Sequence, residues 1–136
     1  MMIVNPFPDL LFYSFYAPTI LRLLLGVVFL DFGFSKLSKD KAVKAEFFEK
    51  IGFRPGTLYA KIFAGIEILA GTSLVLGLYT QIGAIIAGLI LAGTVAIKHK
   101  HPDYLPGNAR YYFALFIIAV SLLLTGAGAQ AIDLPL

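Results

Sequence analysis

Four long apolar segments constrain the fold of this chain of 136 residues more than any other feature. A helix needs about 20 apolar residues to cross the roughly 30 Å hydrocarbon core of a membrane, because it rises about 1.5 Å per residue. Segments of this kind cover residues 17–37, 58–78, 80–97 and 111–126. We therefore expect one all-α membrane domain over residues 1–136, built as a four-helix transmembrane bundle.

The composition supports a membrane protein and excludes several kinds of chemistry. Only 14% of the residues are charged and 59% are hydrophobic, whereas about a quarter of an ordinary soluble domain is charged. The chain has no cysteine, so it carries no disulfide, thiolate metal ligand or thiol redox group. No nucleotide-binding glycine pattern, nucleophile elbow or haem motif is present. We expect the lipid bilayer as a partner and no nucleic acid, because the basic residues lie between the apolar segments.

The connector between the first two apolar segments has a helical pattern of its own. Val43, Phe47, Phe48 and Ile51 recur at helical spacing in "KDKAVKAEFFEKIGFRPG", with Lys and Glu at many of the other positions. Gly52 is a plausible end of the helix. The pattern predicts a short amphipathic helix on the membrane surface; the alternative is a solvated loop.

The distribution of Lys and Arg predicts the orientation. The first and third connectors hold nine such residues, and the N-terminal stretch, the second turn and the C-terminal tail hold none. The nine are Lys36, Lys39, Lys41, Lys44, Lys50, Arg54, Lys98, Lys100 and Arg110. Positively charged connectors stay in the cytoplasm. We expect a multi-pass protein of the inner (cytoplasmic) membrane with both termini outside. The N-terminal stretch has no Lys or Arg, so we expect no secretory signal there.

One carboxylate, Glu67, lies near the middle of the second apolar segment, in "GIEILAG". Ala60, Ala64, Glu67 and Gly71 share one helix face at spacings of three and four. A charge in hydrocarbon is costly unless it is paired or neutralised. We expect Arg22 of the first helix to pair with Glu67, because it also lies on a small-residue face. The pair could be structural or part of a functional polar site, and a protonated Glu67 is a further alternative.

Other polar residues lie toward the predicted cytoplasmic ends of the helices. Asp31 is expected to pair with Lys36 or another connector cation. His99, in "KHKHPDY", is expected at the cytoplasmic end of the third helix, beside a lipid head group. His99 and His101 lie far apart around a helix, so we expect no metal site.

The order of motifs resembles the DoxX family of small membrane proteins. The resemblance rests on "LRLLLGVVFLDFGFSKL", "FFEKIGFRPGTLYAKIFAGIEILAGTSLVLGLYTQIGA" and "AIKHKH". The positions that carry it are Arg22, Gly26, Gly33, Lys36, Phe47, Gly52, Glu67, Gly71, Gly77 and Thr80. It implies a four-helix transmembrane bundle, in which Gly26, Gly33, Lys36, Gly71, Gly77 and Thr80 serve structure and topology. Relatives named DoxD and DoxA look like subunits of a thiosulfate:quinone oxidoreductase, and others are associated with membrane redox complexes.

Two main functional hypotheses follow. In the first, the chain is a redox-associated or quinone-interacting subunit beside a membrane or peripheral oxidoreductase, with Glu67, Arg22 and His99 as the polar groups of the site. In the second, it is a non-enzymatic lipid-binding or assembly protein. A small proton-coupled carrier is a third. Whether the chain is itself an enzyme stays open, and a quinone is the one cofactor considered.

Overall fold

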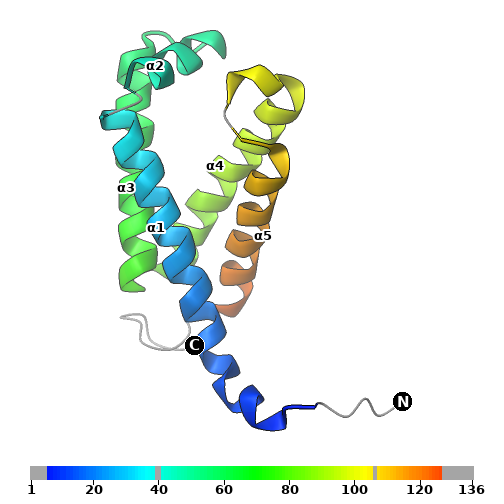
Figure 1. The fold of residues 1–136 in the computed structure, drawn as a ribbon. Coiled ribbons are helices and arrows are strands. Elements are labelled where there is room, and N and C mark those ends of the chain that lie inside the picture. Colours follow the sequence, from blue (N-terminus) through cyan, green and yellow to red (C-terminus); the bar gives the residue numbers. More distant parts are fainter. Residues whose placement is uncertain (1–5, 39–40, 106, 127–136) are drawn as a thin grey trace.

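The computed structural model describes residues 6–38, 41–105 and 107–126, and every regular element in these ranges is helical (Figure 1). The α-helices are α1 (Ala17–Leu37), α2 (Lys41–Lys50), α3 (Gly56–Leu76), α4 (Thr80–Lys100) and α5 (Ala109–Thr125). Two 3₁₀ helices, η1 (Pro8–Tyr16) and η2 (Pro102–Tyr104), precede α1 and follow α4. The predicted all-α class is confirmed.

Three of the described helices are long and apolar enough to cross a membrane, namely Pro8–Leu37, Gly56–Leu76 and Thr80–Lys100. The fourth apolar helix, α5, has 17 residues, which is near the lower limit for a span. The helix ends differ from the expected spans by a few residues. Helix α3 ends at Leu76 because Gly77 adopts a left-handed conformation with φ of 72°, and a residue in this conformation terminates a helix.

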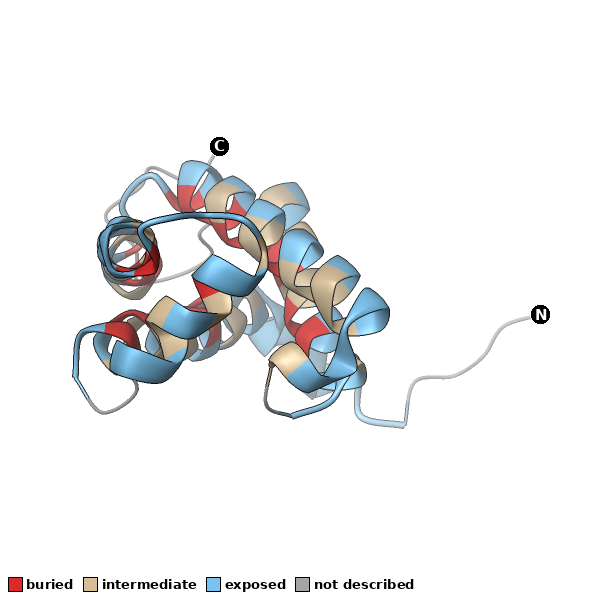
Figure 2. Ribbon diagram, turned by 90° about the horizontal axis from the view of Figure 1, so that it is seen from above, coloured by how far each residue is buried: buried red, intermediate tan, exposed pale blue. Residues whose placement is uncertain are grey.

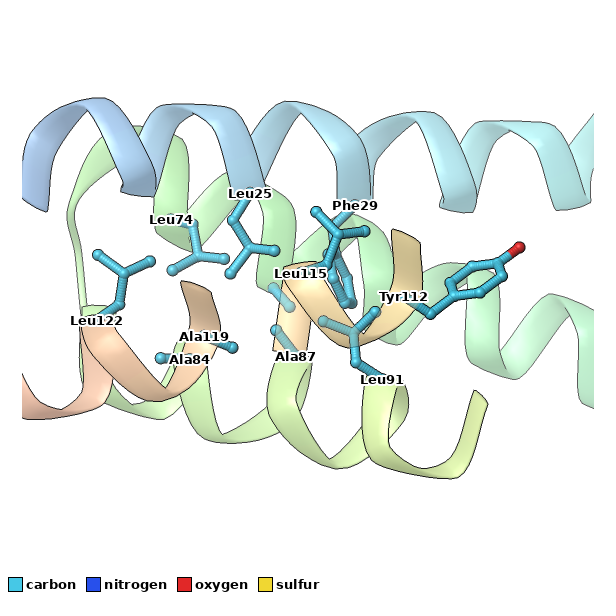
Figure 3. Packing of buried hydrophobic residues seen from close by; sticks show 11 residues of the cluster. Leu25, Phe29, Leu74, Ala84, Ala87, Leu91, Tyr112, Leu115, Ala119 and Leu122 are labelled. Carbon is cyan, nitrogen blue, oxygen red and sulfur yellow. The ribbon is translucent and has the colours of Figure 1, made fainter. Parts of the chain in front are cut away.

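The helices pack as two close pairs. In the described residues α1 packs mainly on α3, and α4 packs mainly on α5. An apolar core fills the space between the pairs, and Figure 3 shows Leu25 and Phe29 of α1 close to Leu115 of α5. Figure 2 looks down on the bundle and shows buried residues on the inward helix faces and exposed ones on the outward faces. The outward faces carry large apolar side chains such as Leu69 and Leu124, as a lipid-facing surface requires.

Glycines set the close contact between α1 and α3. A β-carbon added to Gly71 would lie 2.8 Å from the Gly26 carbonyl oxygen and 2.9 Å from the Leu30 nitrogen. One added to Gly33 would lie 3.0 Å from the Ala64 carbonyl oxygen. Small residues at a membrane helix interface let the backbones approach and gain van der Waals contact. The antiparallel pair is therefore registered with Gly26 opposite Gly71 and Gly33 opposite Ala64.

A short turn joins α3 to α4. Gly77 and Tyr79 both have positive φ, 72° and 52° respectively. The Ser73 hydroxyl donates to the Leu78 carbonyl oxygen and, at 3.4 Å, to that of Tyr79. Thr80, the first residue of α4, is buried. The turn holds the two pairs of helices together at the end opposite α2 (Figure 1).

The connector helix α2 lies across one end of the bundle, over the start of α3 (Figure 1). A β-carbon on Gly56 would lie 2.0 Å from the Ala45 carbonyl oxygen, so only glycine allows this crossing. Phe48 is buried, and its ring lies 5.0 Å from that of Phe63 on α3, between centroids. The predicted helix is present, and its aromatic side chains pack toward the bundle.

Candidate functional site

Glu67 forms a buried ion pair with Lys36. The Lys36 Nζ lies 2.7 Å from the Glu67 Oε2, and the two side chains are 11% and 3% exposed. Lys36 lies in the last turn of α1 and Glu67 near the middle of α3. Each charge satisfies the other in a region where either alone would be costly.

The expected pairing of Glu67 with Arg22 is wrong. The Arg22 Nη1 donates instead to the Leu74 and Val75 carbonyl oxygens, at 3.2 Å in both cases. These carbonyls lie in the last turn of α3, about 10 Å along the helix from Glu67 at the usual rise per residue. Arg22 is 1% exposed and places its positive charge at the negative end of the α3 dipole. These two hydrogen bonds cap the C-terminal end of α3.

The direction of the side chains explains why Lys36 reaches Glu67 and Arg22 does not. Side chains on an α-helix lean toward the N-terminus of that helix. Because α1 and α3 are antiparallel, the side chains of Lys36 and Glu67 lean toward each other. The side chains of Arg22 and Glu67 lean apart.

The other polar residues considered from the sequence lie away from this pair. His99 is exposed in the last turn of α4 and does not line the cavity described below. Asp31 is exposed, and its expected pair with Lys36 does not form, because Lys36 binds Glu67; Asp31 makes no ion pair with any described residue. In the described ranges no group of three His, Cys, Asp or Glu side chains is placed to hold a metal ion.

A cavity of about 360 Å³ adjoins the ion pair, between α1, α2, α3 and α4. Its polar groups come from Lys36, Glu67, Lys44 and Thr94. The rest of the wall is apolar and is formed by Phe47, Phe48, Ile51, Phe53, Phe63, Leu89, Ile90, Gly93, Ile97 and Leu105. Four phenylalanines thus face a site that also holds a cation and a carboxylate.

The polar groups of the cavity are fixed in place to different degrees. Glu67 is held by Lys36. The Thr94 hydroxyl donates to the Ile90 carbonyl oxygen at 2.8 Å, and its oxygen lone pairs can accept a hydrogen bond. Lys44 reaches the site from α2 and lies close enough to act electrostatically on Glu67. The site offers ammonium donors and a carboxylate acceptor beside flat aromatic walls.

Sequence reasoning missed most of this cavity. Lys36 was expected to serve topology, and Lys44 was counted only as a connector cation. The apolar pattern of Phe47 and Phe48 was recognised, but it was interpreted as a membrane-facing surface. No signal in the sequence alone identifies Lys36, because the antiparallel register that brings its side chain toward Glu67 follows from the contacts of Gly26 and Gly33 with α3 in the structure.

Comparison with known proteins identifies relatives but no solved structure. The DoxX family model matches residues 17–100. "Putative oxidoreductase CatD" of Bacillus subtilis is 31% identical over 115 residues, which is 84% of this chain and 82% of that protein. "Uncharacterized membrane protein Rv3486" of Mycobacterium tuberculosis is 32% identical over 126 residues, 83% of this chain and 77% of that protein. No solved structure matches significantly.

Proposed function

We propose that this chain, which belongs to the DoxX family of multi-pass membrane proteins, binds a quinone in the cavity at Lys36 and Glu67 as a subunit of a membrane redox system. The observation that carries the proposal is the buried ion pair, which forms the polar end of a cavity with aromatic walls. Small-molecule sites typically combine apolar walls with a few convergent polar groups. The name of the oxidoreductase relative agrees with a redox role.

The two ends of a quinone ring match what the cavity offers. The Lys36 ammonium is placed to donate a hydrogen bond to a quinone carbonyl oxygen. The Glu67 carboxylate is placed to accept one from a quinol hydroxyl. The rings of Phe48 and Phe63, with centroids 5.0 Å apart, supply apolar surface for the ring system. Because the chain has no cysteine, we propose that electrons pass between the quinone and a membrane or peripheral oxidoreductase subunit.

The second candidate is a non-enzymatic lipid-binding or assembly role. The apolar wall of the same cavity favours it, because an acyl chain needs only such a surface. The two candidates differ in what they ask of Lys36 and Glu67. A quinone uses both as hydrogen-bonding partners, whereas an acyl chain uses neither.

Filling the cavity should weaken quinone binding. A β-carbon at Gly93 meets no atom within 4 Å, and Gly93 lines the cavity. We therefore expect Gly93→Leu to fold normally and to weaken binding of a short-chain ubiquinone or menaquinone by about tenfold or more, through loss of the apolar contact area. Titration calorimetry of the detergent-purified protein measures the affinity. The matched control is Gly65→Leu on α3, which also has open space but does not line the cavity.

The same titration distinguishes the two candidate functions. Glu67→Gln should weaken quinol binding if the carboxylate accepts the hydroxyl proton. If Gly93→Leu binds the quinone as tightly as the unchanged protein, the cavity is not the quinone site. If a fatty acid competes at the same site and Glu67→Gln leaves both affinities unchanged, the lipid-binding role is favoured.

We also propose that the cavity lies toward the cytoplasm. Among the described residues, α2 and the segment between α4 and α5 lie at the same end of the bundle (Figure 1), and these connectors carry the basic residues; Lys39 lies outside the described residues. Because the chain has no cysteine, single cysteines can report orientation. A membrane-impermeant maleimide should label Asp9→Cys in intact cells and Lys41→Cys only after permeabilisation. The reverse pattern would contradict the proposed orientation.

A further inference from the structure

A second hollow, of about 340 Å³, lies where the end of α2 meets the end of α4. It is lined by Lys50, Ile51, Ala96, Ile97, Lys100, His101 and Tyr104. These residues include two lysines and a histidine but no carboxylate. The hollow adjoins the quinone cavity, since Ile51 and Ile97 line both.

Specific contacts position Lys50, His101 and Tyr104 at the hollow. The Lys98 Nζ donates to the Pro102 and Leu105 carbonyl oxygens, at 2.5 Å each, and thereby ties η2 to α4. The His101 ring stacks on Tyr104 with centroids 4.5 Å apart and planes at 10°. The Lys50 Nζ lies 5.5 Å from the centroid of the Tyr104 ring. Tyr104 thus brings Lys50 of α2 and His101 of the following segment to one wall.

The acidic residues near the hollow neutralise little of the positive charge of its lysines. Glu46 lies 3.4 Å from Lys50, but both side chains are well exposed, and such pairs contribute little. Glu49 and Asp103 are also exposed, and neither lines the hollow. The lining of the hollow thus offers ammonium and imidazole groups and no carboxylate to an anion.

We infer that this hollow binds the phosphate head group of an anionic phospholipid. Lysine and histidine donors are suited to phosphate oxygens, and basic pockets between membrane helices bind anionic lipid head groups. The hollow lies at the last turn of the apolar helix α4, and the end of a membrane-spanning helix is where lipid head groups are expected. Ala96 and Ile97 continue from it along α4 and provide the apolar surface along which the acyl chains lie. The inference is independent of the quinone proposal.

Native mass spectrometry of the purified protein tests the inference with phosphatidylglycerol against phosphatidylcholine. We expect a preference of about tenfold or more for phosphatidylglycerol, because each basic residue near an anionic surface contributes a factor of about five. Lys50→Gln with Lys100→Gln should reduce the preference by about tenfold. Lys50→Arg with Lys100→Arg should retain it.

The matched control removes the same charge elsewhere. Lys41 and Lys61 are exposed and do not line the hollow, so Lys41→Gln with Lys61→Gln should keep the preference within about twofold. An equal loss in this control would show general charge attraction and would overturn the inference. Absence of any preference in the unchanged protein would also overturn it. So would displacement of phosphatidylglycerol by soluble glycerol phosphate at matched concentration, since the site would then bind a free phosphate ester.

Discussion

Lys36→Met is expected to destabilise the protein by about 3–5 kcal/mol, because it leaves Glu67 buried without its cation. The Glu67 side chain is 3% exposed and binds Lys36 at 2.7 Å. Unfolding of the detergent-purified protein by heat or denaturant measures the loss. Polar contacts between membrane helices contribute on average only about 0.6 kcal/mol. A loss of several kcal/mol in the free energy of unfolding would therefore indicate a buried Glu67 carboxylate left without its cation.

A double variant separates pairing from general damage. Lys36→Met combined with Glu67→Leu removes both charges, and we expect it to lose less stability than the sum of the two single changes. Lys61→Met is the matched control, because Lys61 is an exposed lysine on α3 that forms no ion pair with a described residue. It should change stability little. Losses that simply add would show that Lys36 and Glu67 do not interact energetically.

Gly71→Ala is expected to destabilise the protein by about 1–3 kcal/mol, the usual cost of inserting a methyl group into a well-packed interface. The new β-carbon would lie 2.8 Å from the Gly26 carbonyl oxygen and 2.9 Å from the Leu30 nitrogen. Both are backbone atoms, so no side-chain rotation relieves the contact and α1 must move away from α3. The melting temperature of the purified protein reports the change.

Gly65→Ala is the control for Gly71→Ala in the same helix. Its β-carbon would meet no atom within 4 Å, and alanine is a better helix former than glycine by about 1 kcal/mol. We expect unchanged or slightly raised stability. Equal losses in the two variants would show that the close approach of α1 and α3 at Gly71 is not the cause.

The sequence predicted the helical architecture well because hydrophobic length is a local property. Each apolar segment needs only its own residues to indicate a span, and the pattern around Phe47 and Phe48 indicated α2 in the same way. Glu67 was recognised as exceptional for a related reason, since a charge within an apolar run is visible without any knowledge of packing.

The partner of Glu67 could not be predicted from helix faces alone. Arg22 and Lys36 both lie on the α1 face that meets α3, and both are buried. The choice between them depends on the register of two antiparallel helices and on the direction in which their side chains lean. That register follows from the contacts of Gly26 and Gly33 with α3, which only the three-dimensional structure gives.

The residues that line the cavity could not be predicted from the sequence for a different reason. Lys44 and Phe47 enter it from α2 and Thr94 enters it from α4, so these residues are distant in sequence. Their meeting depends on the crossing of α2 over α3 at Gly56, where a β-carbon would lie 2.0 Å from the Ala45 carbonyl oxygen. A backbone contact of this kind leaves no periodic pattern in a single sequence.

Photolabelling with an azido-quinone tests the proposed quinone site most directly. The label should enter the peptides that contain Phe47 and Thr94, and excess unlabelled quinone should suppress it. Gly93→Leu should strongly reduce the labelling, and Gly65→Leu should not. Labelling confined to outward-facing positions such as Leu69 and Leu124, without competition by unlabelled quinone, would contradict a quinone site at Lys36 and Glu67.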